Sequence, residues 1–162
     1  MVVQVMEDLI AVIGCGNPNR SDDGVGIEVA RRLAPRARPE LRILDAGTDG
    51  MAVMFAARGC KTLIIVDACT TGASPGTLFQ APAELLAVPH RPSYTLHDFR
   101  WDHALYAGRK MFGTEFPTDL TVLLIEARSV AFGIGLSADV SAAAAKAVER
   151  VEQLLVERGV EL

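Results

Sequence analysis

The fold is indicated first by residues 9–26, which read LIAVIGCGNPNRSDDGVG. The run of apolar residues that opens this stretch is typical of a strand covered on both faces. Gly14 and Gly16 then permit a tight turn and a close approach of the backbone. Asp22 and Asp23 follow, at the start of a segment with helical spacing. The stretch therefore predicts a buried strand, a glycine turn and a helix, which is the repeating unit of an α/β fold.

The rest of the chain repeats this alternation. Continuous apolar runs predict strands that are covered on both faces at Leu9 to Ile13, Leu41 to Leu44, Leu63 to Val66 and Leu120 to Ile125. A short edge strand is predicted within residues 75–80. Helical spacing predicts helices at Asp23 to Ala34, Met51 to Ala57, His97 to Phe112 and Ala138 to Arg158, the last with Ser137 as N-cap and Gly159 beyond its end. This order predicts one α/β domain over residues 1–162: a three-layer sandwich with a mostly parallel twisted sheet of about five strands and flanking helices.

Composition narrows the class of protein. The chain has 162 residues, 50% of them hydrophobic, and a net charge of −4, which suits a globular domain with a real core. Apolar runs all fall well short of the roughly 18 residues that span a bilayer, so we expect no membrane insertion. The acidic balance argues against nucleic acid as a partner. Three cysteines without CxxC spacing indicate reduced thiols and a cytoplasmic location, and we expect Cys15 and Cys69 to be buried and inert.

Acidic residues occur where the predicted strands end. Asp22 and Asp23 follow the first strand, Asp45 the second, Asp67 the third and Glu126 the fourth. The carboxyl ends of parallel strands meet at one edge of a sheet, where such folds bind ligands. Carboxylates crowded at one rim repel each other, and a divalent cation is the simplest balancing charge. The pattern therefore predicts a metal site, but by itself it does not choose among these acids.

His97 is the candidate ligand of a different kind. At a helix N-terminus the dipole disfavours a protonated imidazole, which leaves a neutral ring able to bind metal. Two carboxylates, one imidazole and an open position suit an ion such as zinc or nickel. His103 would lie on another face of the same helix and is the weaker candidate.

Each acid also has a simpler structural interpretation. Asp22 or Asp23 can cap the helix that follows, and taken alone that is the commoner role. Asp45 and Asp67 can each accept hydrogen bonds from the backbone of a strand-to-helix turn. Glu126 can be a surface residue at a strand end. Only the agreement of several strand ends with one histidine favours the metal site.

A dinucleotide site is the alternative interpretation of the glycine turn. Gly14 and Gly16 follow a strand, and Asp45 could accept a hydrogen bond from a ribose. The fingerprint needs a third glycine at the position where this chain has Asn19. The two glycines instead let the backbone approach a bound peptide or the acidic loop that contains Asp22 and Asp23. Neither a GxxxxGK[ST] loop nor a GxSxG elbow occurs in the sequence. The sequence thus favours metal chemistry, and it assigns no catalytic residue.

Four segments resemble the [NiFe]-hydrogenase maturation endopeptidase family. They are residues 14–26 (GCGNPNRSDDGVG), residues 45–48 (DAGT), residues 65–68 (IVDA) and the downstream His97. The first segment follows the specific pattern G-x-G-N-x-x-x-x-D-[DE]-x-x-G, and the resemblance extends over about residues 9–136. The chain departs from the family at Ala46, at Ala127 and after His97, where residues 98–103 read DFRWDH instead of a small-residue run.

The resemblance implies an endopeptidase that removes a C-terminal extension from the nickel-loaded [NiFe]-hydrogenase large-subunit precursor, with nickel as the recognition element. It implies that Asp23, Asp67 and His97 bind the metal. It implies that Asp45, Gly47 and Thr48 contact the substrate. Nickel is then bound at the site or supplied by the substrate, and zinc or cadmium can substitute for it. The alternative is a nickel-binding accessory protein that docks on the precursor without hydrolysing it.

Overall fold

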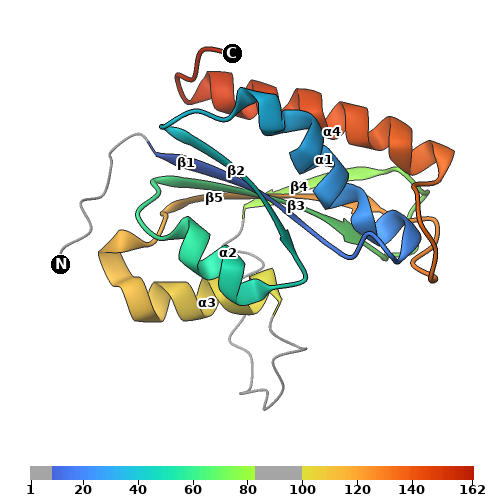
Figure 1. Ribbon diagram of the computed structural model, residues 1–162, viewed down its shortest axis with the longest axis horizontal. Coiled ribbons are helices and arrows are strands. Elements are labelled where there is room, and N and C mark those ends of the chain that lie inside the picture. The colour runs from blue at the N-terminus through green and yellow to red at the C-terminus, as the bar shows by residue number, and fades with distance from the viewer. Residues whose placement is uncertain (1–8, 83–99) are drawn as a thin grey trace.

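The computed structural model describes residues 9–82 and 100–162, and its central sheet lies between two layers of helices (Figure 1). The strands are β1 (Ile10–Cys15), β2 (Leu41–Gly47), β3 (Thr62–Cys69), β4 (Leu78–Pro82) and β5 (Asp119–Glu126). Their order is β2-β1-β3-β5-β4, with β4 antiparallel to β5 and the other pairs parallel. The predicted α/β sandwich is confirmed, and so is the edge strand, which begins at Leu78.

Helices cover both faces of the sheet (Figure 1). On one face lie α1 (Val25–Leu33) and α4 (Ala138–Glu157), and on the other lie α2 (Gly50–Ala57) and α3 (Trp101–Phe112). The first helix starts later than predicted because Ser21–Gly24 forms a 3₁₀ turn. The third also starts later, since the backbone at Arg100 is extended and serves as N-cap. Along the described residues, no helix has the length and apolar character needed to cross a bilayer.

The core has two parts, one on each side of the sheet. Val12, Ile64 and Val66 point toward α1 and α4, where Leu33 and Leu155 complete the packing. The alternate strand positions point the other way, toward α2 and α3: Ala11, Ile13, Leu63, Ile65, Val53, Met54 and Leu105. Burial on both faces explains why β1 and β3 are continuously apolar.

The edge strand β2 does not follow the prediction that all four apolar runs are covered on both faces. Leu41 is fully buried, whereas Leu44 is 36% exposed. The strand has β1 as its only neighbour in the sheet of the described residues, and several of its positions are exposed or only half-buried. Apolar composition alone does not distinguish a central strand from such an edge strand.

Candidate functional site

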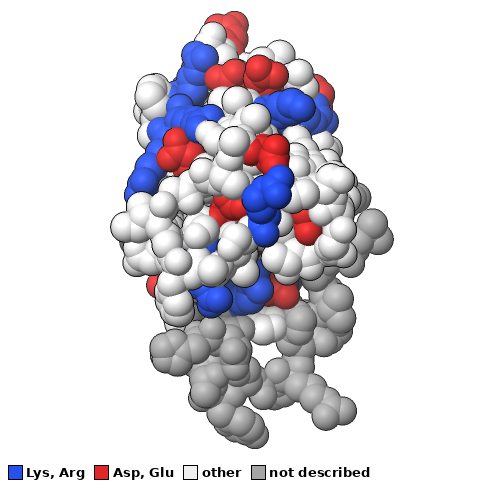
Figure 2. Space-filling model, turned by 90° about the vertical axis from the view of Figure 1, so that its right-hand side faces the viewer, with Lys and Arg blue, Asp and Glu red and all other residues white. Residues whose placement is uncertain are grey.

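A pocket of about 680 Å³ lies at the carboxyl ends of β1 and β3. In the sheet, β2 and β3 lie on opposite sides of β1, so the connection that follows β1 and the connection that leads to β3 run to opposite sides. Open α/β sheets bind ligands in the crevice where two connections diverge in this way. Its walls come from the turns after β1, β2 and β3 and from the starts of α2 and α3. Figure 2 views this end of the molecule, where acidic and basic side chains are interspersed.

Glycines bring the loop that carries Asp23 against the ends of these strands. Gly16 has a φ of +132°, and a Cβ there would lie 1.8 Å from the Asp23 carbonyl oxygen. A Cβ on Gly26 would lie 2.2 Å from the carbonyl oxygen of Val66 in β3. Only glycine permits such an approach. The prediction that the glycine turn lets the backbone approach the acidic loop is therefore confirmed.

Asp23 is half-buried and lines the pocket. Its Oδ2 accepts a hydrogen bond from the backbone N–H of Asn17 at 2.9 Å. This bond ties the carboxylate to the glycine turn and fixes its position relative to β1. A carboxylate offers about four acceptor positions, so the side chain keeps acceptor capacity toward the pocket.

Asp67 lies on β3 and lines the same pocket, with only 3% of its surface exposed. Its Oδ2 accepts hydrogen bonds from Trp101 Nε1 at 2.8 Å and from Arg100 Nη2 at 3.4 Å. Its Oδ1 accepts from the N–H of Ala68 at 2.8 Å. Burial raises the pKa of Asp67, and the bonds from Trp101 and Ala68 and the charge of Arg100 offset only part of this rise. The negative charge of Asp23 raises that pKa further, because the two carboxylates are close enough to repel.

Asp22 faces away from the pocket and organises the loop before α4. It is 1% exposed and accepts hydrogen bonds from the N–H groups of Arg128, Ser129 and Ser137 and from the Ser137 hydroxyl, at 2.7 to 3.2 Å. Although burial acts in the opposite direction, these bonds hold the pKa of Asp22 below its ordinary value. The interpretation of Asp22 or Asp23 as a cap of α1 is wrong, because Gly24 is the N-cap and receives no side-chain hydrogen bond.

Asp45 and Glu126 do not line the pocket. Asp45 Oδ1 accepts from the N–H of Gly47 at 2.9 Å, which is the predicted role in a turn. Glu126 is buried, and its carboxylate accepts from the N–H and hydroxyl of Thr71 and the N–H of Gly72 at 2.7 to 3.1 Å. Both acids lie at the carboxyl ends of their strands as predicted, but local backbone donors engage their carboxylates, so neither belongs to the pocket that Asp23 and Asp67 line.

The other predicted residues of the second strand end do reach the pocket. Gly47 and Thr48 both line it, and the carbonyl of Gly47 accepts a hydrogen bond from the N–H of Gly16 at 2.8 Å. This bond joins the turns after β1 and β2. Of the predicted substrate-contacting set, Gly47 and Thr48 line the pocket and Asp45 accepts a hydrogen bond within their turn. Their contact with a substrate stays a prediction.

Two cysteines are among the residues that line the pocket. Cys15 is buried, and burial together with the charge of Asp67 raises its pKa well above the ordinary range. Burial and the neighbouring Glu126 raise the pKa of Cys69 to about 12. Raised pKa values favour the protonated, less reactive thiol at both positions. Cys15 is buried as predicted, whereas the prediction of burial is wrong for Cys69, which is half-buried.

Several lining residues were not predicted from the sequence. They are Arg20, Asp49, Arg100, Trp101 and Asp102. Asp49 caps α2 through bonds to the N–H groups of Met51 and Ala52. The one available signal was DFRWDH, because an arginine and a tryptophan stand there where the resembled family has small residues.

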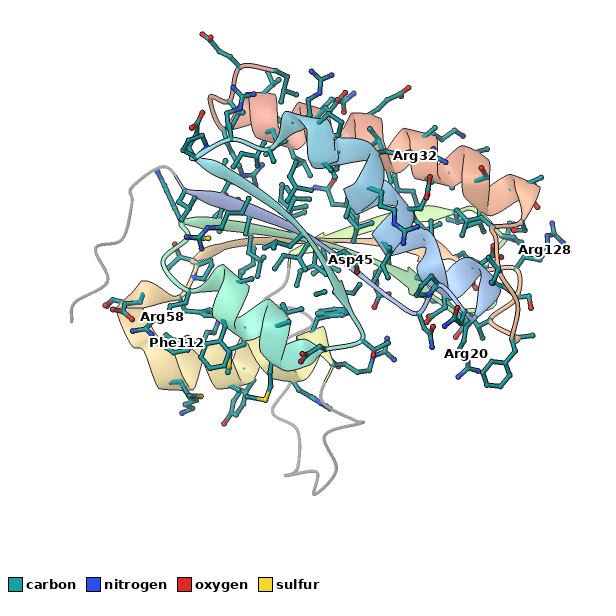
Figure 3. All side chains as sticks on the ribbon, in the orientation of Figure 1. Arg20, Arg32, Asp45, Arg58, Phe112 and Arg128 are labelled. Carbon is teal, nitrogen blue, oxygen red and sulfur yellow. The ribbon has the colours of Figure 1, made fainter. Side chains whose placement is uncertain are left out.

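The rim also carries two strongly exposed apolar side chains. Phe132 is 86% exposed and Ile134 is 91% exposed. Arg20, which projects from this end of the molecule (Figure 3), lies over the Phe132 ring at 5.3 Å. The loop is held to the turn after β1 by backbone bonds of Gly133 with Asn19 and Ser21. It thus presents apolar side chains from a fixed backbone.

His97 lies outside the described residues. The chain enters the described region again at Arg100 and Trp101, both of which line the pocket. Within residues 9–82 and 100–162, no three His, Cys, Asp or Glu side chains are grouped so that they could hold a metal ion. His103 does not line the pocket. Asp23 and Asp67 are therefore the part of the predicted metal set that the structure brings together.

Comparison with known proteins identifies the family. The family model of hydrogenase maturation proteases matches residues 27–154. The chain is 32% identical over 155 residues to the hydrogenase 2 maturation protease of Escherichia coli (strain K12), covering 94% of this chain and 93% of that protein.

Solved structures agree with this result. The hydrogenase maturating endopeptidase HybD from E. coli superposes with a TM-score of 0.79 at 30% identity, covering 94% of this chain and 95% of that one. The hydrogenase 2 maturation peptidase from Thaumarchaeota archaeon SCGC_AB-539-E09 superposes with a TM-score of 0.68 at 26% identity, covering 94% and 99%. Matching along nearly the whole chain, in sequence as well as in fold, shows that this chain belongs to the hydrogenase maturation protease family and is a peptidase.

Proposed function

We propose that the chain removes a C-terminal extension from the nickel-loaded large-subunit precursor of a [NiFe]-hydrogenase, and that it recognises the nickel. The observation that carries the proposal is that Asp23 and Asp67 open onto one pocket. The residues that directly follow the His97 segment, Arg100 and Trp101, line this pocket as well. Carboxylate and imidazole groups together form a donor set that suits nickel.

In this proposal nickel belongs to the substrate. The precursor holds the ion, and Asp23, Asp67 and His97 complete its coordination when the precursor docks. Zinc or cadmium can take the same position in a test, because both accept carboxylate and imidazole ligands. A divalent ion held there would supply Lewis-acid chemistry, which polarises carbonyl groups and activates water. The chain's own contribution is to hold two carboxylates in fixed positions, through Asn17 for Asp23 and through Trp101 for Asp67.

The rim of the pocket supports a protein substrate. Phe132 and Ile134 stand in solvent beside the lining residues Arg20 and Val130. Exposed apolar side chains on a fixed backbone are typical of surfaces that contact another protein. Gly47 and Thr48, which also line the pocket, would contact the precursor as well. All three cysteines are free thiols, which supports a reducing compartment such as the cytoplasm as the place of action.

The test compares two histidine variants on nickel-loaded precursor. His97→Ala should abolish the mass decrease of the large subunit, because it removes a proposed nickel ligand. His103→Ala, on α3 but outside the pocket lining, is the matched control and should cleave normally. Unchanged cleavage by His97→Ala would contradict the ligand assignment. Tight binding of the precursor by the unmodified protein without any cleavage would instead favour the accessory-protein alternative.

A further inference from the structure

The site already contains a cation of the protein's own. Arg100 Nη2 lies 3.4 Å from Asp67 Oδ2, and both residues line the pocket. The two side chains differ sharply in burial, since Arg100 is 64% exposed and Asp67 only 4%. A buried carboxylate therefore has a positive charge beside it that stands largely in solvent and can move away without disturbing the core.

We infer that Arg100 is a specificity-determining residue: it occupies the cation position beside Asp67 and keeps free divalent metal ions out until the precursor brings its own. The inference rests on the proposed function, in which nickel arrives with the substrate. A divalent ion bound to Asp67 would lie within several ångströms of the guanidinium, where like charges repel strongly. A free ion must therefore overcome this repulsion with few ligands. When a docked protein carries the nickel ion, the binding free energy of the whole interface is available to displace Arg100.

Trp101 fixes the position of the Asp67 carboxylate. Its Nε1 donates to Asp67 Oδ2 at 2.8 Å, and Trp101 is only 9% exposed, in the part of the core that lies between the sheet and α2 and α3. Trp101 is thus a positioning residue that holds the carboxylate still while Arg100 is free to leave. The backbone supports this division, because Arg100 is the extended N-cap of α3, its side chain makes no cap hydrogen bond, and Trp101 is the first helical residue.

The same geometry supplies a reporter, because Trp101 is the only tryptophan in the sequence. Its indole donates to the carboxylate that a metal ion would bind, so its fluorescence should respond to occupancy of the site. Cadmium and nickel salts can therefore be titrated into the free protein, without precursor, and followed by tryptophan emission. Calorimetry gives the same dissociation constants independently of the fluorophore.

The experiment compares Arg100→Gln with three other variants. Arg100→Gln should bind cadmium and nickel at least about tenfold more tightly than the unmodified protein, because it removes a like charge from the cation position. Arg100→Lys keeps that charge and should stay within about threefold of the unmodified protein. Lys110→Gln makes the same change of net charge on the exposed part of α3, away from the pocket lining, and should leave affinity unchanged. Adding Asp67→Asn to Arg100→Gln should abolish the gain.

Equal affinity of Arg100→Gln and the unmodified protein would overturn the inference, and so would an equal gain in Lys110→Gln. A gain that survives the loss of the Asp67 carboxylate would also overturn it, since the ion would then bind elsewhere. Cleavage of nickel-loaded precursor is scored separately. If the unmodified protein fails to cleave, the proposed function is wrong whatever the affinities. If it cleaves while the affinities are equal, only the role of Arg100 is wrong.

Discussion

Asp22 and Asp23 are adjacent in the chain and serve different purposes because they lie in a 3₁₀ turn. With three residues per turn, neighbouring side chains point about 120° apart. Asp22 therefore reaches the backbone N–H groups of the loop before α4, while Asp23 faces the pocket. One residue organises the fold around the site, and the other belongs to the site.

The structural role of Asp22 predicts a loss of stability on substitution. Asp22→Asn should lower the free energy of unfolding at pH 7 by about 2 kcal/mol, because an amide cannot accept all the hydrogen bonds that the carboxylate accepts. Urea denaturation measures this change. Asp139→Asn is the matched control: it removes a carboxylate that pairs with Arg128 at an exposed position, which should cost little.

The difference between Asp22→Asn and the unmodified protein should also depend on pH. Hydrogen bonds hold the pKa of Asp22 below its ordinary value of 3.8, so the ionised carboxylate stabilises the fold above that pH. This contribution is lost as the pH falls through the lower pKa of the folded protein. The stability difference should therefore shrink when the comparison moves from pH 7 to acid conditions. A difference that stays constant down to the acid limit of folding would contradict the assignment.

Strand and helix patterns could not separate these two aspartates, since both follow the first strand and either could cap the helix after it, and only the family resemblance chose Asp23. Their separation depends on the 3₁₀ turn and on Ser129 and Ser137, which are more than a hundred residues away. Pairing of Asp67 with Arg100 and Trp101 is equally long-range. In contrast, Asp67 at the end of β3 was predictable, because strand ends follow from the local apolar pattern.

At the scale of elements, α1 lies unusually close to the sheet. A Cβ on Gly14 would lie 2.1 Å from the carbonyl oxygen of Gly26, and one on Gly26 would lie 2.2 Å from that of Val66 and 2.4 Å from that of Cys15. The helix and the strands therefore meet backbone to backbone at these glycines. This contact places the preceding turn, and with it Asp23, beside the end of β3.

Gly26→Ala tests this packing. The added methyl group would meet backbone atoms that cannot rotate away, so the free energy of unfolding should fall by about 3 kcal/mol or more. Arg31→Ala, on the exposed face of α1, controls for the change of helix composition and should be nearly neutral. Thermal or urea denaturation measures both. A neutral Gly26→Ala would show that α1 can move off the sheet without cost.

The exposed apolar side chains of the loop before α4 should affect cleavage of the precursor and leave the stability of the protein unchanged. Replacing Phe132 and Ile134 together by serine should lower kcat/KM for the precursor about tenfold, because exposed apolar side chains contribute to a protein interface. Their exposure means that stability should change by less than about 0.5 kcal/mol. Met111→Ser, which removes another exposed apolar side chain outside the pocket lining, is the control. Equal kcat/KM for all three proteins would exclude the loop from the interface.

Over the whole molecule, the alternation of apolar runs and helices was enough to predict the sandwich, the parallel sheet and the edge at which the site lies. Order within the sheet then decides which strand ends adjoin, and here β1 and β3 are neighbours while β2 lies at an edge. That order explains why Asp23 and Asp67 share a pocket. Asp45 does not line it although Gly47 on the same strand does, because its carboxylate accepts the N–H of Gly47 within the turn. Periodicity carries no information on strand order, so the sequence alone could not choose among the acids.

The most direct test of the proposed function uses one precursor in two forms. Nickel-loaded and nickel-free large-subunit precursor are each incubated with the protein, and intact mass is followed over time. We expect a single C-terminal truncation of the nickel-loaded form, absent with Asp67→Asn, and no change in the nickel-free form. Equal cleavage of both forms, or cleavage of neither, would contradict the account of Asp23 and Asp67 as the carboxylates that recognise nickel.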